Sequence, residues 1–299
     1  MFGLPYQGVA TFLKSPLDAH RPFGFVGIPY DGSVTFRPGA RLAPNAIRRA
    51  SMMLTDGHHP EFATDPCERV TDLGDIDITQ VAQHAALARI EEAVTALGQA
   101  RPSCRLMMAG GDHLTTLGVL RALRRRFDQP LALIHFDAHC DTWARHFGDD
   151  IGHGTFLRNA IEEGVVDPTR TMSLGLRSPV DPVTREWLIG QGGLQMSSRQ
   201  LMRTEGEALA RHVRERIGDA PVYVTFDIDV LDPAHAPGTG TPEIGGITTM
   251  KALELLESLR HCNMVGMDVV EVSPPFDNHD VTALAAATLL WTWAAMLPL

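Results

Sequence analysis

The sequence predicts an α/β fold in which a mostly parallel sheet is covered by helices on both faces. Short, continuously apolar runs alternate along the chain with longer segments that carry a helical apolar pattern. Such runs belong to strands buried between two layers of helices, because a half-exposed strand alternates apolar and polar residues. In addition, no Pro/Gly/Ser-rich linker or internal repeat divides the chain. Residues 1–299 are therefore expected to form a single domain.

Eight short apolar runs are expected to form the strands. They cover residues 23–28, 69–73, 104–109, 131–136, 171–176, 222–226 and 264–270, with a weaker run near 194. Between them, one helix is expected to begin at Pro44, because proline suits the first helical turn. Another should span 79–97, with Thr79 as its N-cap and Gly98 just past its end. Further helices are expected at 115–127, 156–163, 182–189, 198–217, 249–259 and 281–296.

Composition and charge narrow the class of protein. Hydrophobic residues make up 44% of the chain and charged residues 21%, which excludes a disordered or fibrous protein. The 26 basic and 36 acidic residues give a formal net charge of −10, and such a surface repels the phosphates of nucleic acids. The apolar stretch at 283–297 is shorter than the roughly 20 residues of a membrane span. We therefore expect neither nucleic acid nor a membrane as a partner.

The cysteines and the first residues bear on the compartment. Four cysteines stand far apart in the sequence, at Cys67, Cys104, Cys140 and Cys262. They form no CxxC pair, so reduced thiols are expected instead of disulfides or a cysteine zinc site. Residues 1–14 lack the basic and apolar regions of a signal peptide. Both observations predict a cytoplasmic protein.

Three of the expected strands are followed directly by histidine and aspartate residues. The segment GGDH follows residue 109, DAHCD follows residue 136, and DID follows residue 226. In parallel α/β sheets, ligands bind beyond the carboxyl ends of the strands. One such motif alone is a weak signal, but the three together predict a metal site at this edge of the sheet.

The spacing within the motifs predicts which side chains converge. In an extended chain, residues two apart point in the same direction. The expected ligands are therefore His113, Asp137, His139, Asp141, Asp227 and Asp229. Cys140 would face the opposite way. Four neighbouring carboxylates cannot all stay ionised without cations, and two divalent ions would neutralise them.

The type of donor indicates the metal and the reaction. Hard oxygen atoms with imidazoles favour Mn²⁺, and Zn²⁺, Fe²⁺, Co²⁺ and Ni²⁺ are alternatives. A pair of such ions activates water at neutral pH, so we expect a hydrolase. Two classes of substrate stay open at this point, namely phosphate esters and carbon centres such as amides or guanidines.

Longer segments around these motifs resemble those of the ureohydrolases, the family of arginases and agmatinases. Besides GGDH and DAHCD, they are FRPGARLAPNAIR at 36–48, HGT at 153–155, TFDIDVLDPAHAPGTGTPEIGG at 225–246 and GMDVVEVSPPFDNHDVTALAA at 266–286. The resemblance extends through nearly the whole chain and is strongest for agmatinases and guanidinobutyrase-type enzymes. It implies a three-layer α/β/α fold with an eight-stranded sheet, in agreement with the count of expected strands.

The resemblance also implies roles for individual residues. A binuclear Mn²⁺ centre would be held by the pair His113 and Asp141, the pair His139 and Asp229, and the bridging pair Asp137 and Asp227. Glu271 corresponds to the glutamate that binds the guanidinium group of the substrate. His153 corresponds to the histidine that exchanges protons with solvent, and Asp141 would carry a proton to the leaving nitrogen. The family commonly forms trimers or hexamers, so a homo-oligomer is implied.

The loop after DAHCD, residues 142–152, bears on the substrate. It departs from the arginase pattern of Asn and Ser positions, which argues against arginine. Asp149 and Asp150 suit the terminal ammonium group of agmatine, whereas Arg145 suits the carboxylate of 4-guanidinobutyrate or 3-guanidinopropionate. Agmatine, cleaved to putrescine and urea, is the preferred substrate, and the guanidino acids are the alternatives.

Two other readings come from different classes of protein. A two-metal phosphoesterase shares the DAH motif, but the GNH(D/E) and GHxH segments of such enzymes are absent from the sequence. A non-catalytic homologue would be expected to have lost a metal ligand, yet all the matched positions are present. The sequence therefore predicts a Mn²⁺-dependent amidinohydrolase.

Overall fold

A parallel sheet lies at the centre of the protein. The computed structural model describes residue 4 and residues 6–298. Eight strands lie in the order β2-β1-β3-β8-β7-β4-β5-β6, and every neighbouring pair is parallel. The strands are β1 (Phe23–Gly27), β2 (Val70–Asp75), β3 (Arg105–Ala109), β4 (Leu131–Phe136), β5 (Val166–Leu176), β6 (Leu194–Ser197), β7 (Val222–Asp227) and β8 (Met264–Val270). The predicted α/β sheet is confirmed.

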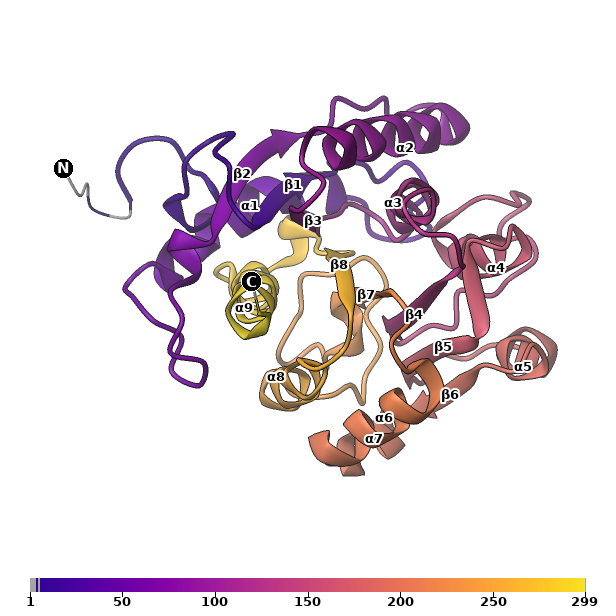
Figure 1. The fold of residues 1–299 in the computed structure, drawn as a ribbon. Helices are drawn as coiled ribbons and strands as arrows, with labels where there is room; N and C mark the ends of the chain where they lie inside the picture. The colour runs from indigo at the N-terminus through magenta and orange to yellow at the C-terminus, as the bar shows by residue number, and fades with distance from the viewer. Residues whose placement is uncertain (1–3, 5, 299) are drawn as a thin grey trace.

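Helices cover both faces of the sheet (Figure 1). One layer contains α2 (Gln83–Ala100), α3 (Leu114–Arg124), α4 (Phe156–Glu162) and α5 (Pro182–Gly190). The other contains α1 (Ala43–Ala50), α6 (Ser198–Arg203), α7 (Gly206–Ile217), α8 (Thr249–Ser258) and α9 (Val281–Met296). Because both faces are covered, strands such as β4 are buried along their whole length.

The C-terminal helix α9 is part of the core, as its apolar sequence predicts. Its Trp293 is fully buried and meets Phe23 of β1 edge-on, with ring centroids 5.3 Å apart. Burial of an aromatic side chain of this kind contributes about 2–3 kcal/mol to the free energy of unfolding. Within the part of the chain that the structure describes, we find no helix with both the length and the apolar character needed to cross a membrane.

One predicted helix start is wrong. Helix α2 begins at Gln83 instead of Thr79, and it continues through Gly98. The start is displaced because the side chain of Gln80 donates a hydrogen bond of 2.6 Å to the carbonyl of Pro29, in the loop after β1. That tertiary contact holds residues 79–82 outside the helix.

The helix predicted at 198–217 is two helices, α6 and α7. Thr204 and Glu205 between them are extended. The N–H of Gly206 donates to the carboxylate of Glu254 on α8 at 2.7 Å, so this contact with a neighbouring helix replaces a helical hydrogen bond. The remaining predicted helices lie within a few residues of α1, α3, α4, α5, α8 and α9.

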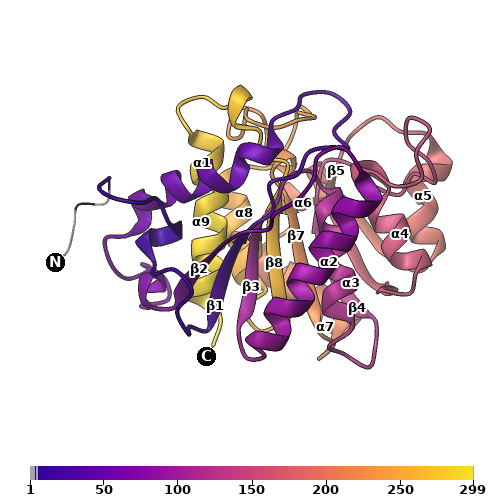
Figure 2. The same ribbon diagram turned by 90° about the horizontal axis from the view of Figure 1, so that it is seen from above.

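The strand order places the predicted motifs side by side. Strands β3 and β4 are consecutive in sequence, but β8 and β7 lie between them in the sheet. Ligand sites of α/β sheets form at such changes in strand order, beyond the carboxyl ends. Figure 2 shows the loops that follow β7 and β8 gathered at one end of the sheet. The fold therefore brings four neighbouring strand ends to one place.

Candidate metal centre and active site

Each of the four central strands ends near residues that the sequence analysis singled out. His113 follows β3 at the start of α3, and Asp137 directly follows β4. Asp227 is the last residue of β7, and Glu271 directly follows β8. The site thus rests on the rigid centre of the sheet, and its side chains come from segments that are far apart in sequence.

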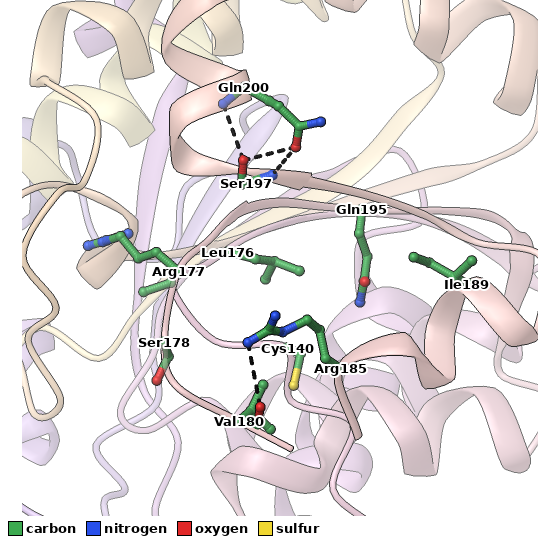
Figure 3. Close-up of a pocket in the computed structure, with 11 residues that line it drawn as sticks. Cys140, Leu176, Arg177, Ser178, Val180, Arg185, Ile189, Gln195, Ser197 and Gln200 are labelled. Atoms are coloured by element: carbon green, nitrogen blue, oxygen red, sulfur yellow. Dashed lines mark hydrogen bonds between the residues drawn. The ribbon is translucent and has the colours of Figure 1, made fainter. Parts of the chain in front are cut away.

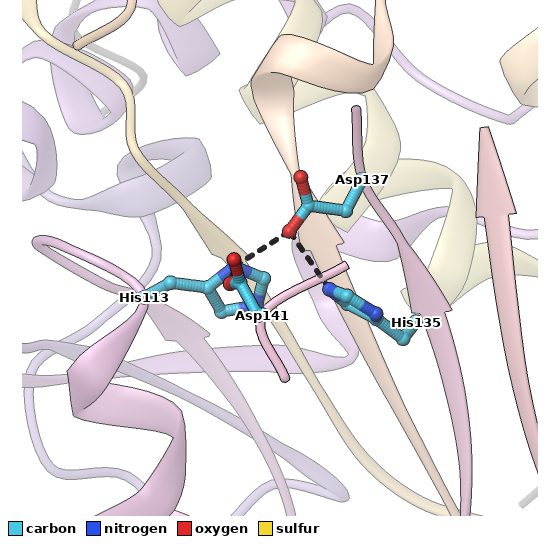
Figure 4. A group of neighbouring side chains, drawn as sticks. All are labelled: His113, His135, Asp137 and Asp141. Carbon is cyan, nitrogen blue, oxygen red and sulfur yellow. Dashed lines mark hydrogen bonds and ion pairs between the residues drawn. The ribbon is translucent and has the colours of Figure 1, made fainter. Parts of the chain in front are cut away.

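The first cluster is centred on Nδ1 of His113 (Figure 4). This nitrogen lies 3.2 Å from a carboxylate oxygen of each of three residues, Asp137, Asp141 and Asp227. On the other side of the ring, Nε2 lies 2.9 Å from the hydroxyl of Thr225 on β7. The imidazole is therefore held with Nδ1 directed at the carboxylates.

The GGDH turn holds His113 in this position. A Cβ on Gly111 would lie 1.5 Å from the carbonyl oxygen of Tyr30, so only glycine fits this close approach of two backbones. Asp112 accepts hydrogen bonds from the N–H and the hydroxyl of Ser33 at 2.8 and 2.7 Å. Asp112 thus joins the start of α3 to the loop after β1.

The second cluster is centred on His139. Its Nδ1 lies 3.1 Å from Oδ2 of Asp229 and 3.2 Å from Oδ1 of Asp137. The possible ligand atoms of His113, Asp137 and Asp141 lie within 4.8 Å of one another, and so do those of Asp137, His139 and Asp229. Asp137 faces both clusters, because its Oδ2 is directed at His113 and its Oδ1 at His139. All six expected ligands therefore meet in two adjacent clusters.

These residues converge through turns and not through the extended geometry that the spacing suggested. Asp141 adopts a left-handed backbone conformation, with φ of 51°. Asp229 lies in a 3-10 turn, η6 (Ile228–Val230), and its N–H donates to the carboxylate of Asp227 at 2.8 Å. The side chains do converge, but the strand-like alternation assumed for them is wrong.

The two clusters concentrate negative charge in a buried space. Asp137, Asp227 and Asp229 are at most 3% exposed. Burial and the charges of Asp229 and Asp137 raise the pKa of Asp227 well above its usual range. Burial lowers the pKa of His113, but the surrounding carboxylates outweigh it and raise that pKa well above the usual value. Without a cation, these groups hold protons that they would otherwise release.

One buried atom tests whether cations fit the clusters. Among the residues that the structure describes, Nδ1 of His113 has no hydrogen-bond partner of suitable geometry, although three carboxylate oxygens lie 3.2 Å away. Nδ1 of His113 and carboxylate oxygens of Asp137 and Asp141 lie within 4.8 Å of one another, which is close enough for one cation to bind all three residues. Imidazole with carboxylate is also a donor set that divalent transition ions accept. The residues therefore fit a pair of divalent cations.

Glu271 and His153 lie beside the first cluster. Oε1 of Glu271 accepts a hydrogen bond from the backbone N–H of His113 at 2.9 Å and lies 3.0 Å from Nδ1 of His153. Oε2 is buried and has no hydrogen-bond partner within residue 4 and residues 6–298. Burial lowers the pKa of His153, but the hydrogen bond and charge of Glu271 outweigh it and raise that pKa to about 9. The site thus contains a protonated imidazole and an unpartnered carboxylate oxygen.

Comparison with known proteins identifies the family. The model of the Arginase family matches residues 21–296. The chain belongs to the arginase family. This arginase-family chain is 42% identical to a guanidinopropionase of Pseudomonas aeruginosa over 301 residues, which cover 98% of this chain and 92% of that protein. It is 43% identical to an agmatinase of Chromobacterium violaceum, over 94% of this chain and 86% of that protein.

Solved structures show the same fold. Proclavaminate amidino hydrolase from Streptomyces clavuligerus superposes with a TM-score of 0.89 and 34% sequence identity, over 98% of this chain and 99% of that chain. The expected resemblance to ureohydrolases is therefore confirmed, and so is the three-layer fold that it implied. The enzyme class predicted from the sequence, an amidinohydrolase, is supported at the level of the family.

Cys140 lies on the other side of the ligand loop in this arginase-family chain. It lines a separate cavity of about 340 Å³, whose walls also include Arg177, Arg185 and Gln195 (Figure 3). The thiol is buried among groups from β5, β6 and α5, away from both clusters. The predicted orientation of Cys140 is therefore confirmed.

Sequence reasoning missed two side chains that contact the clusters. Nε2 of His135, within β4, lies 2.8 Å from Oδ2 of Asp137. Oε1 of Glu243 lies 3.9 Å from Nε2 of His139. The spacing could have indicated His135, because it stands two residues before Asp137 in an otherwise apolar strand. Glu243 lies within the family-like segment 225–246, but its spacing from the ligands did not indicate a contact with His139.

Proposed function

We propose that the chain hydrolyses a guanidino compound to urea and an amine, with agmatine as the preferred substrate and putrescine as the product. One observation carries this proposal, namely that the buried Oε2 of Glu271 has no hydrogen-bond partner in the described part of the chain. An unpaired buried carboxylate oxygen is unfavourable until a ligand supplies a donor, and a planar guanidinium group presents N–H donors that suit it. A Cβ on Gly240 would lie 3.2 Å from this oxygen, so the glycine keeps the space beside it open.

The proposal includes two divalent cations, with Mn²⁺ as the first choice and other divalent transition ions as alternatives. We assign them to the pair His113 and Asp141, the pair His139 and Asp229, and the bridging pair Asp137 and Asp227. The position of Asp137 between the two clusters supports a bridging role. When bound, these cations would lower the pKa of a water molecule and so make it nucleophilic at neutral pH.

The residues around the cations have distinct tasks in this proposal. Glu271 binds the guanidinium group and orients its carbon atom toward the clusters. His153 exchanges protons with solvent, and its Nε2 lies 3.0 Å from the hydroxyl of Thr35, a residue exposed at the surface. Asp141 carries a proton to the leaving nitrogen. Protons can therefore move between the substrate, beside Asp141 and His153, and the protein surface at Thr35.

The surroundings of His153 support agmatine over the guanidino acids. A cavity of about 280 Å³ is lined by His153 and, from the loop after the DAHCD motif, by His146 and Asp149. Arg145 of the same loop is exposed, and its guanidinium group donates to the carbonyl of Gly148 at 2.9 Å. The loop thus presents a carboxylate, and not the arginine, to the cavity beside the site. A carboxylate there suits the ammonium end of agmatine.

A substrate panel tests this proposal. Purified protein loaded with Mn²⁺ should release urea from agmatine with a higher kcat/KM than from 4-guanidinobutyrate, 3-guanidinopropionate or arginine. A generic aryl phosphate should not be cleaved. A higher kcat/KM for a guanidino acid would replace agmatine by that acid. Phosphate release without urea release would overturn the proposed reaction and favour a two-metal phosphoesterase.

We also propose that the chain acts as a cytoplasmic homo-oligomer of three or six single-domain subunits. The free state of all four cysteines is in keeping with a reducing compartment. Light scattering on the purified protein, combined with limited proteolysis, tests the assembly and the single-domain organisation. A monomer at micromolar concentration, or cleavage into two stable fragments, would contradict the respective part.

A further inference from the structure

A fully buried histidine lies behind the candidate metal centre. His135 is on β4, two residues before Asp137, and it is 0% exposed. Its Nε2 lies 2.8 Å from Oδ2 of Asp137, and its Nδ1 lies 2.8 Å from the hydroxyl of Ser173. Figure 4 shows His135 and His113 on either side of the Asp137 carboxylate. Both ring nitrogens are therefore occupied by protein groups.

The contact with Asp137 concerns the one carboxylate that both clusters share. Oδ2 of Asp137 faces Nδ1 of His113, and Oδ1 faces Nδ1 of His139. Each oxygen also has a second partner. The backbone N–H of His139 donates to Oδ1 at 2.6 Å, and Nε2 of His135 is the partner of Oδ2. Rotation of this carboxylate is thus restricted from both sides.

The sheet holds His135 itself in one orientation. His135 and Ser173 are paired residues in the register of β4 and β5, so the hydroxyl is at a fixed position beside the ring. An ionised carboxylate only accepts hydrogen bonds, so Nε2 of His135 carries the proton of that contact. In the neutral imidazole, Nδ1 then accepts from the hydroxyl of Ser173. The carboxylate of Asp137 therefore fixes the tautomer that carries its proton on Nε2, and the hydroxyl of Ser173 matches it by donating to Nδ1.

This geometry separates two roles that His135 can have. Its position among His113, Asp137 and Asp141, with ligand atoms within 4.8 Å of one another, is close enough for a metal ligand. However, a nitrogen that donates its proton to Asp137 has no lone pair for a metal. The other ring nitrogen is occupied by Ser173 and lies on the far side of the ring. His135 is therefore not placed as a ligand.

We propose that His135 is a positioning residue, which orients the shared carboxylate of Asp137 through a hydrogen bond and so strengthens cation binding by the His113 cluster. This inference rests on the metal centre of the proposed function. Since His135 contacts the oxygen that faces His113, its removal should weaken that cluster more than the His139 cluster. Groups that orient metal ligands in this way typically change metal affinity by about 10–100-fold.

Three substitutions of His135 distinguish the effect of its N–H donor from the effect of its side-chain volume. His135→Gln keeps an N–H donor near the position of Nε2, His135→Asn places its amide near Nδ1 and loses the donor to Asp137, and His135→Phe keeps only the volume. Mn²⁺ affinity is measured from the electron paramagnetic resonance signal of free Mn²⁺. Each variant is also combined with His139→Ala, which leaves the His113 cluster, and with His113→Ala, which leaves the His139 cluster.

The proposal predicts that Mn²⁺ affinity falls only at the His113 cluster, and only in variants that lose the N–H donor to Asp137. With His139→Ala present, the Phe and Asn variants should bind Mn²⁺ about 10–100-fold more weakly, and the Gln variant should stay within about 3-fold of its parent. With His113→Ala present, all three should stay within about 3-fold. Ser173→Ala should weaken the His113 cluster in the same direction but less, and it keeps the test available where His135→Phe does not fold.

The outcomes distinguish this inference from the proposed function. Equal losses for the Gln and Phe variants would make His135 a ligand and overturn the positioning role. Unchanged affinity in every variant, or equal losses at both clusters, would overturn it as well. A wild-type protein that binds no Mn²⁺ would instead overturn the metal centre. Wild-type binding of two ions with unaltered variants would leave the centre intact and reject only the role of His135.

Discussion

His153 and Glu271 are joined through only one oxygen of the carboxylate. Nδ1 of His153 lies 3.0 Å from Oε1 of Glu271, whereas Oε2 is buried and none of the described residues forms a hydrogen bond with it. The two residues are 118 positions apart in sequence and reach each other from the 3-10 turn before α4 and from the end of β8. One oxygen of Glu271 therefore holds the imidazole in place, and the other stays available to a substrate.

The different roles of the two Glu271 oxygens lead to the first prediction. Glu271→Gln removes the negative charge that faces the guanidinium group but keeps the size of the side chain. Removal of one partner from a buried charge pair typically costs about 2–5 kcal/mol, so kcat/KM for urea release should fall at least about 30-fold. The Mn²⁺ content should stay that of the wild type, because Glu271 is not an expected ligand. Exposed Glu186 provides a matched control, Glu186→Gln, which should leave kcat/KM unchanged; equal values for both variants would contradict a binding role of Glu271.

The raised pKa of His153 leads to a prediction about stability. Its pKa of about 9 in the folded protein lies above the ordinary value of 6.5. Protonation of His153 therefore stabilises the fold fully below about pH 6.5, and this contribution is lost as the pH rises through about 9. The difference in pKa corresponds to about 3 kcal/mol at most. Chemical denaturation of the metal-free protein should show this decrease, measured relative to His153→Asn.

His84 offers the control for that measurement. It is exposed, so His84→Asn should keep the pH dependence of the wild type. The difference in unfolding free energy between wild type and His153→Asn should shrink between pH 6.5 and pH 9. A difference that stays constant over this range would show that His153 does not titrate as described.

Much of the fold could be predicted because parallel strands have a distinctive sequence pattern. The six residues of β4 are apolar or buried without alternation, and such runs can be recognised one at a time. The errors arose where a distant group decides a helix boundary. Residues 79–82 stay outside α2 through the contact of Gln80 with Pro29, and the break before Gly206 involves Glu254. No local pattern contains this information.

For the candidate site, the sequence predicted the location but not the detailed contacts. Three motifs at strand ends were enough to predict that six side chains would converge, since the ends of parallel strands share an edge. The role of His135 was not predictable, because it depends on β5 lying beside β4 and presenting Ser173. The free oxygen of Glu271 was also beyond prediction, since it depends on which groups occupy the other oxygen. Motifs thus indicated the place of the site, and only packing defined its contacts.

Substitution of Asp227 should have opposite effects on stability in the absence and in the presence of Mn²⁺. Burial and neighbouring carboxylates raise its pKa, so ionisation of Asp227 destabilises the metal-free fold increasingly as the pH rises above about 4. At pH 8 and without metal, Asp227→Asn should therefore melt higher than the wild type, by about 2–4 °C for each kcal/mol of relief. With Mn²⁺, the wild type should gain stability and release urea, and the variant should do neither. Exposed Asp128 supplies the control Asp128→Asn, which should follow the wild type in both conditions.

The next prediction concerns removal of the metal, which tests the metal centre independently of the fold. A chelator should abolish urea release, and added Mn²⁺ should restore it, because the ligands of both clusters lie within the folded sheet edge and need no refolding to bind again.

Metal ligands bind in their deprotonated form, and the nucleophilic water must also lose a proton. Urea release should therefore rise as the pH increases above neutrality, and Mn²⁺ affinity should rise in parallel. Initial rates from pH 6 to pH 9 with saturating Mn²⁺ separate the two effects, since saturation removes the contribution of affinity. A flat profile under those conditions would mean that deprotonation of the nucleophile does not limit the reaction, and full activity after metal removal would refute the metal centre itself.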